Sequence, residues 1–276
     1  MAFEPAVVLR TDFNPVPRAE LTFLTVPAGA VTATVFRVVN GVSLRVRGAV
    51  GVFASGGFAV VDVEIPFLVD VSYRAELFDG GGFPLGFTDE TVVRMNFAGT
   101  VFHNPLVPTT GLLVDPLPPF AGDLSAPFDG ELVQPLGGGA PVWVGFGRTG
   151  LRGVALDVAT DTDGQATQLA ALFGSAGMAL PPILCVRADP KWRLPLPFFA
   201  VVATPREQRF NVEFNGQIRY WQLTGDEVRP PAPTLSAAGL TYLDMETFYA
   251  DYATVEAAYL TYLDAESDFT LAGFAS

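Results

Sequence analysis

The residues able to do acid–base or nucleophilic chemistry are few in this chain of 276 residues. His103 is the only histidine and Cys185 the only cysteine, whereas general acid–base and nucleophilic catalysis need a tunable base beside a nucleophile or a paired carboxylate. The setting of His103, Phe-His-Asn-Pro, predicts a structural turn. Apolar neighbours around Cys185 predict a buried strand thiol, and a lone cysteine excludes an internal disulfide. We therefore expect that the protein is not an enzyme.

One acidic group has spacing that suits a metal ion. Asp157, Asp161 and Asp163 offer oxygen ligands that can converge on calcium, but the Gly-x5-Glu pattern of an EF-hand loop does not follow them. A solvated turn and helix cap is the favoured interpretation. The glycines at 137–139 precede Ala-Pro rather than a helix with Lys-Ser or Lys-Thr, which predicts a flexible loop and no phosphate site. We expect no metal and no cofactor.

Three tryptophans, Trp143, Trp192 and Trp221, are candidate platforms for stacking against sugars. Trp192 is flanked by Pro190 and Pro195, which favours a loop anchor packed on a sheet. These aromatics nevertheless support a carbohydrate-binding module as an alternative function.

Composition limits the partners that the chain can have. Half of the residues are hydrophobic and 16% are charged, against about a quarter in ordinary soluble domains, so much apolar surface must be hidden. The net charge of −13 would repel a polyanion, which makes nucleic acid an unsuitable partner. No apolar run reaches the roughly 20 residues of a membrane-spanning helix, and the N-terminus shows no secretory pattern. We expect synthesis in the cytoplasm, no membrane insertion, and burial of apolar surface against neighbouring subunits.

The segment 18–96 has the pattern of consecutive short strands. Apolar residues alternate with Thr32, Thr34 and Arg37, the pair Asn40-Gly41 predicts a hairpin turn, and apolar residues then alternate with Ser43, Arg45 and Arg47. This spacing predicts an immunoglobulin-like or fibronectin-III-like antiparallel β-sandwich. Its expected core contains Val35, Val46, Val60, Tyr73 and Leu77.

The segment 99–232 has a mixed pattern. Residues 99–119 are rich in proline and predict an extended linker, and residues 125–144 predict a loose hairpin or a surface loop. A strand is expected at 151–160, then a helix capped by Thr162 or Asp163, strands at 183–187 and 198–203, and a last strand at 219–223. These elements predict an α+β domain. Its expected core contains Leu156, Leu169, Phe173, Leu184 and Val201.

A sequence repeat with a period of ten residues follows the proline-rich stretch 229–233. Residues 240–249, 250–259 and 260–269 align without gaps, with Tyr third, Glu seventh and an aromatic residue tenth. Ten residues fall short of three helical turns, so short helices are expected in place of one rod, each capped by Asp244, Thr254 or Asp264. So short a segment cannot bury its own aromatic residues. We predict that it binds a partner through Tyr242, Tyr249, Tyr252, Tyr259, Tyr262 and Phe269, with Glu246, Glu256 and Glu266 facing solvent or a basic partner.

The predicted organisation is therefore mainly β. It comprises an N-terminal arm at 1–17, a β-sandwich domain at 18–98, an α+β domain at 99–232 and a helical, acidic, aromatic repeat tail at 233–276.

Several of these stretches resemble minor tail proteins of long-tailed phages that infect actinobacteria. The resemblance rests on four stretches in the first domain, three in the second and the ten-residue repeats: 45–49, 57–60, 64–67, 71–76, 103–106, 148–162, 187–193 and 240–269. None of them is a catalytic motif.

The resemblance implies a structural virion protein at the distal end of the phage tail, with an α+β domain similar to the belt domain of distal tail proteins. It implies assembly with tail tube, distal tail or hub proteins, a homo-oligomer in a tail ring, and a possible contact with host cell-wall glycan. The alternatives left open are a carbohydrate-binding host-recognition module and, third, a cell-wall hydrolase with paired carboxylates across a groove.

Overall fold

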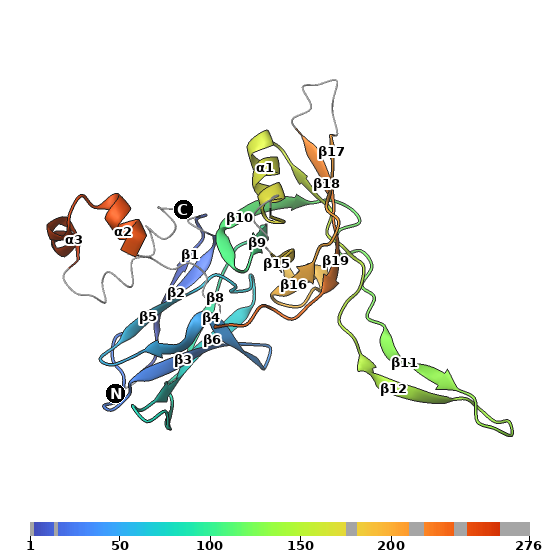
Figure 1. Cartoon of the computed structure of the whole chain (residues 1–276), viewed down its shortest axis with the longest axis horizontal. Helices are drawn as coiled ribbons and strands as arrows, with labels where there is room; N and C mark the ends of the chain where they lie inside the picture. The colour runs from blue at the N-terminus through green and yellow to red at the C-terminus, as the bar shows by residue number, and fades with distance from the viewer. Residues whose placement is uncertain (1–2, 14–15, 175–180, 210–217, 235–241, 260–276) are drawn as a thin grey trace.

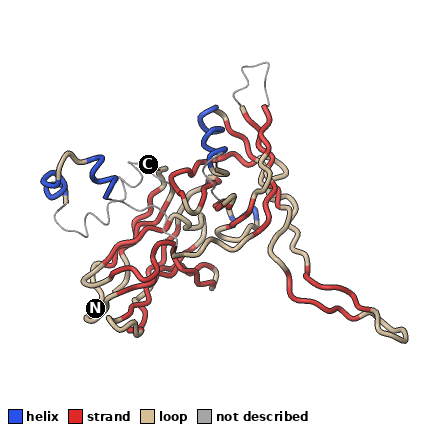
Figure 2. The backbone as a smooth tube through the Cα atoms, in the orientation of Figure 1, coloured by secondary structure: helices blue, strands red, loops and turns tan. Residues whose placement is uncertain are grey.

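The computed structural model describes residues 3–13, 16–174, 181–209, 218–234 and 242–259, and within them the chain is mainly β (Figures 1 and 2). Two hydrophobic clusters organise it, one formed by residues up to Val101 and the other by residues from Phe102 onward.

Two antiparallel sheets surround the first cluster. The three-stranded sheet has the order β1-β2-β5, and the other has the order β4-β3-β6-β7 with β8 also paired to β6. The strands are β1 (Ala6–Arg10), β2 (Arg18–Phe23), β3 (Thr32–Val39), β4 (Val42–Phe53), β5 (Phe58–Asp62), β6 (Asp70–Phe78), β7 (Pro84–Phe87) and β8 (Thr91–Arg94).

The sequence predicted the core of this first unit well. Its five expected core residues are all buried, and the stacked rings of Phe23 and Phe58 lie among them with centroids 4.4 Å apart. The predicted hairpin joins β3 to β4, and its turn residues Asn40 and Gly41 both have positive φ (50° and 78°), as a type I′ turn requires. The residues expected to form an N-terminal arm contain β1, which pairs with β2.

The second cluster is enclosed by a nine-stranded sheet of order β13-β19-β16-β15-β9-β10-β14-β18-β17. Its strands are β9 (Thr100–Asn104), β10 (Val107–Pro116), β13 (Val154–Ala155), β14 (Val158–Thr160), β15 (Ile183–Arg187), β16 (Phe198–Val201), β17 (Arg206–Arg209), β18 (Arg219–Gln222) and β19 (Thr224–Glu227).

This sheet must curl strongly. β13 and β14 are joined by two residues, yet they occupy the first and seventh places in the strand order. Six strand spacings in a flat sheet would separate them by about 29 Å, which two residues cannot span. β18 and β19 also require a curled sheet, because Leu223 alone separates them in sequence while five strands lie between them in the strand order. The curled sheet therefore wraps around its own core.

The extended linker expected at 99–119 is wrong. The segment forms β9 and β10, which lie in the middle of the sheet, with Phe102, Leu112 and Val114 buried. The prolines are tolerated because Pro105 stands in the turn and Pro108 lies where the β9–β10 register shifts.

The other strand predictions need three corrections. The strand expected at 151–160 is interrupted at Leu156 and Asp157. β18 is not the last strand, because Thr224–Glu227 forms β19 without an apolar pattern. In β16, Ala200 is fully buried and Val201 is only half-buried, so the prediction of Val201 as core is wrong. The run Phe-Phe-Ala-Val-Val is apolar throughout, and its alternation therefore gave no indication of which face is buried.

Helix α1 (Asp163–Ala171) packs beside this sheet, capped by Thr162, whose side chain accepts a hydrogen bond from the Gln165 backbone N–H. Leu156, Leu169 and Leu184 are buried as predicted, and Phe173 is only partly buried against the same cluster. A short 3₁₀ helix, η1 (Pro190–Trp192), precedes β16.

Two short helices, α2 (Tyr242–Phe248) and α3 (Tyr252–Ala258), form the described part of the repeats, as expected from the ten-residue spacing. The predicted caps are wrong. Asp251 caps α3 and Thr254 completes the capping box from the third helical position, while Asp244 lies inside α2. Asp264 lies outside the described residues. None of the described helices is long and apolar enough to cross a membrane.

Candidate functional site

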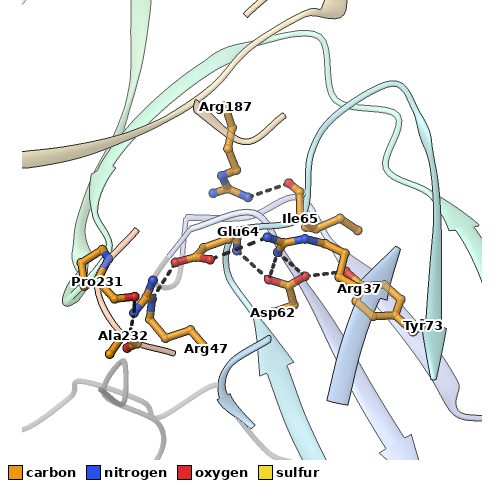
Figure 3. Close-up of polar contacts among 9 residues, drawn as sticks. All are labelled: Arg37, Arg47, Asp62, Glu64, Ile65, Tyr73, Arg187, Pro231 and Ala232. Atoms are coloured by element: carbon orange, nitrogen blue, oxygen red, sulfur yellow. Dashed lines mark hydrogen bonds and ion pairs between the residues drawn. The ribbon is translucent and has the colours of Figure 1, made fainter. Parts of the chain in front are cut away.

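A cluster of buried charges occupies the junction between the two units (Figure 3). Arg37 donates from Nη1 to both carboxylate oxygens of Asp62 at 2.7 Å, and Asp62 also accepts from the hydroxyl of Tyr73 at 2.7 Å. All three side chains are buried. Burial acts to lower the pKa of Arg37, but the charges of Asp62 and Glu64 outweigh it and raise that pKa. The guanidinium therefore stays charged, and the cluster is a rigid structural network.

A second arginine ties the proline-rich stretch to the first unit. Arg47 donates to Glu64 at 2.6 Å and to the carbonyl oxygens of Pro231 and Ala232 at 3.1 and 3.0 Å (Figure 3). The backbone N–H of Gly48 donates to the carbonyl of Pro233 at 2.8 Å. The chain that leaves the second unit is thus fixed against β4.

Sequence alternation placed Arg37 and Arg47 on the polar, outer side of their strands, and the structure corrects this. Both are buried because Asp62 and Glu64 approach them from the segment at the end of β5. The signal was available in the run Val61-Asp-Val-Glu-Ile65, where two acids stand inside an apolar stretch.

Arg187 extends from β15 into the same junction. Its Nη1 donates to the carbonyl of Pro17 at 2.6 Å, and its guanidinium lies 4.8 Å from the centroid of the Phe67 ring. Burial lowers its pKa to about 10. Burial also raises the pKa of its strand neighbour Cys185, a fully buried thiol as the sequence predicted.

His103 is a strand residue of β9 and not part of a turn, which corrects the sequence prediction. Its imidazole is fully buried, and neither ring nitrogen has a hydrogen-bond partner in the described structure. Burial lowers its pKa well below the usual value, and the charges of Arg187 and Arg47 lower it further. A histidine in this setting is held neutral and has no acid to orient it.

We expect stability to fall as the pH drops from 7.5 to 5.5, because His103 takes up a proton in the unfolded chain near pH 6.5 and not in the folded one. This protonation lowers the free energy of unfolding by about 1.4 kcal/mol for each pH unit below the unfolded-state pKa, until the pH reaches the folded-state pKa. Urea unfolding at several pH values measures it. Since His103 is the only histidine, His103→Leu removes this slope, and a wild-type slope equal to that of the variant would contradict the buried neutral imidazole.

The three acids whose spacing suited a metal ion, and for which a solvated turn and helix cap was the favoured interpretation, do not converge. Asp157 is buried and accepts hydrogen bonds from the Tyr220 hydroxyl and the Leu223 backbone N–H, while Asp163 pairs with Arg219. Within the described residues, no group of three or more His, Cys, Asp or Glu side chains could hold a metal ion. Asp157 joins β18 to the loop between β13 and β14, which is a structural role.

The three tryptophans lie in different environments. Trp221 is 3% exposed and donates from its indole nitrogen to Thr160. Trp192 packs edge-on against Phe120 with centroids 5.0 Å apart, so the predicted loop anchor is confirmed. Only Trp143 of the three is well exposed, at 47%.

Part of the predicted aromatic partner site lies in α2 and α3. The hydroxyls of Tyr249 and Tyr259 are 3.2 Å apart, and their rings meet edge to face. Tyr252 is largely exposed, and Glu246 and Glu256 face solvent. Tyr242 begins α2, and Tyr262, Glu266 and Phe269 lie outside the described residues. The tenth residues of successive repeats thus contact each other, and Tyr252 remains open.

Among the described elements, the most exposed apolar one is a hairpin that the sequence predicted only as a loose hairpin or loop. β11 (Phe128–Val133) and β12 (Val142–Arg148) pair with each other, and every residue of both strands is exposed. We call residues 128–148 the arm. Figure 1 shows it projecting away from both units.

Both faces of the arm are apolar. Cross-strand partners share a face, so Leu132 and Trp143 lie on one face, and the Phe128 ring contacts Trp143 there. Gly130 leaves space for the indole, since a Cβ at this position would be 2.6 Å from Trp143 Cζ2. The opposite face carries Val133, Val142, Val144 and Phe146, which are 41–83% exposed.

Charge is confined to the base of the arm. Asp129, Glu131 and Arg148 are its only charged residues, and the sixteen positions from Leu132 to Gly147 carry none. Alternation places Asp129 and Glu131 on the same face as Val144. The missed signal was the run Val-Trp-Val-Gly-Phe at 142–146, because uninterrupted apolar residues are typical of strands covered on both faces.

The arrangement can therefore bind a protein surface, and its polar clusters are structural. No known protein family matches the chain, and no curated protein or solved structure is significantly similar to it.

Proposed function

We propose that this chain is a structural subunit of a phage virion, located at the distal end of a long tail, that assembles with other tail proteins and performs no catalysis. The observation that carries the proposal is the arm. No described part of the chain covers its two apolar faces, and an exposed patch of this kind is typical of a protein–protein interface.

The arm has the composition of an interface. Phe146 is 83% exposed and Trp143 is 47% exposed, and aromatic anchors such as these commonly account for most of the binding free energy. A strand pair apolar on both faces requires a cover on each side, which a subunit inside an assembly receives and an isolated protein does not. The aromatic repeats supply a second segment of the same character, with Tyr252 exposed.

The proposal includes a specific fold for each of the two units. Two facing sheets over one core favour an immunoglobulin-like or fibronectin-III-like first domain, and one helix beside a curled sheet favours a belt-like second domain. The tail tube, distal tail or hub proteins, and further copies of this chain in a ring, are the proposed partners.

A carbohydrate-binding module remains the alternative. Of its three proposed platforms, only Trp143 is open to a sugar ring, because Trp221 is buried and Trp192 packs against Phe120. One exposed tryptophan with an exposed phenylalanine beside it is a small platform, so we favour assembly.

Electron microscopy of purified particles labelled with an antibody against the first unit tests the location. We expect label at the distal tail end, and unlabelled particles would contradict the proposal. A chain with residues 129–147 replaced by Gly-Asn-Gly should fold, because the arm lies outside both cores, yet fail to enter particles. Normal entry of that variant into particles, together with loss of binding to cell-wall glycan, would favour the alternative.

A further inference from the structure

Helices α2 and α3 enclose a groove of about 370 Å³ where the first repeat meets the second. Its lining includes Met245 and Val255, which are half-buried, and the rings of Tyr249 and Tyr252. Among the described residues, only those of α2, α3 and the turn between them line the groove. Tyr252 is 74% exposed, so its ring is open to a partner.

The groove also has acidic side chains in its lining, Glu246 and Asp251. The Asp251 carboxylate accepts a hydrogen bond from the backbone N–H of Thr254 at 2.9 Å, as the cap of α3. Glu246 is exposed and forms no hydrogen bond or ion pair within the described part of the chain. Residues 235–276 include seven acidic residues and no lysine, arginine or histidine. A cation that pairs with Glu246 therefore has to come from outside this segment.

The first unit contains an example of what an aromatic ring beside a carboxylate binds. The guanidinium of Arg74 lies 4.5 Å from the centroid of the Phe87 ring and donates to the carboxylate of Glu90 at 2.8 Å. A planar guanidinium can lie on a ring and pair with a carboxylate at the same time, whereas the compact ammonium of lysine is more strongly hydrated. The groove supplies the ring and the carboxylate, in Tyr252 and Glu246, without the arginine.

We propose that the groove between α2 and α3 binds an arginine side chain from a basic segment of a partner protein, with the guanidinium on the Tyr252 ring and paired with Glu246. This inference rests on the proposed function, in which the repeats take part in assembly, and it names the chemistry of one partner. The methylene groups of the arginine pack on Met245 and Val255. A net charge of −13 attracts a basic partner and repels a second copy of the chain.

Titration of the purified full chain with synthetic peptides tests the groove. The probes are a peptide of three Gly-Leu-Arg-Ser units and two counterparts with lysine or glutamine in place of arginine. Isothermal titration calorimetry in about 50 mM salt keeps the ion pair weakly screened. We expect the arginine peptide to bind about threefold more tightly than the lysine peptide, and the glutamine peptide not to bind.

Two exposed residues of the groove can be changed without loss of folding. Tyr252→Leu keeps an apolar side chain and removes the ring, while Glu246→Gln keeps the shape and removes the charge. Each should weaken binding of the arginine peptide about threefold, and the double variant about tenfold. Tyr252→Leu should also abolish the preference for arginine over lysine. Phe53→Leu and Glu131→Gln, at exposed positions outside the groove, are the matched controls and should bind as the wild type does.

Three results would overturn the proposal. The first is equal affinity for the arginine peptide and either counterpart, since attraction by net charge or by the peptide backbone would then suffice. The second is wild-type affinity in the double variant. The third is dimerisation of the wild type that is lost in Tyr252→Leu, which would make a second copy the occupant of the groove.

The peptide titration and the particle labelling separate the two proposals. Labelled tail ends without selective arginine binding would reject the groove and retain the tail subunit. Selective arginine binding with unlabelled particles would reject the tail location and retain the groove.

Discussion

Replacing Asp62 by alanine is expected to destabilise the protein by about 3–5 kcal/mol, because it leaves Arg37 buried without its main counter-charge. The same carboxylate accepts from the Tyr73 hydroxyl and from the Glu64 backbone N–H at 2.9 Å, so those donors lose their acceptor as well. Among the described residues, Glu64 is then the one acid that still pairs with Arg37, with its carboxylate 3.7 Å away. Chemical denaturation followed by fluorescence or circular dichroism measures the loss.

The matched control is an exposed ion pair on the same sheet. Glu90→Ala removes the partner of Arg74, and we expect a cost below about 1 kcal/mol because water solvates the remaining charge. The double variant Arg37→Met, Asp62→Leu should be more stable than Asp62→Ala, since it leaves no unpaired charge in the cluster. Equal, small losses for Asp62→Ala and Glu90→Ala would show that water reaches the cluster.

Leu169→Ala is expected to cost about 2–5 kcal/mol, because Leu169 is fully buried between α1 and the curled sheet. The loss combines the transfer free energy of the removed methyl groups with the cavity that they leave. Leu132→Ala makes the same chemical change at a residue of the arm that is 66% exposed, and surface changes of this kind cost about 0.5 kcal/mol or less. Thermal and urea unfolding of both variants provides the comparison.

An unchanged midpoint in Leu169→Ala would show that α1 does not pack on the sheet. A large loss in Leu132→Ala would show that the arm is covered in solution, which is the result that self-association through the arm produces at high concentration. Measuring Leu132→Ala at two protein concentrations therefore separates folding from assembly.

The core of the first unit was predictable because its sheets are half-buried. Tyr73, Ala75 and Leu77 alternate with polar residues, and this alternation by itself assigns the inner face. The rule failed at Arg37 and Arg47, where a polar residue is inside because Asp62 at the end of β5 and Glu64 just after it neutralise the charge. Local periodicity contains no information about a counter-charge that comes from 25 residues away in the sequence.

The second unit was less predictable because its sheet is covered and curled. Apolar runs such as Phe-Phe-Ala-Val-Val do not identify an inner face, and β19 has no apolar pattern at all. Gly225 is needed there because a Cβ would lie 2.8 Å from the Ala200 Cβ, a contact that only the strand order creates. The prolines of 99–119 suggested a linker, and long-range pairing made strands of that segment.

By itself the sequence determined the mainly β class, the Asn40-Gly41 hairpin, the inner residues of the first unit, a helix that starts at Thr162 or Asp163 and the division of the repeats into short helices. Each of these depends on propensity or alternation within about ten residues. Only the tertiary structure decided which charges are buried, which tryptophan is exposed and that the apolar run 142–146 stands free as an arm. Those outcomes depend on what packs against a side chain, and for the arm the described part of the chain supplies nothing to cover it.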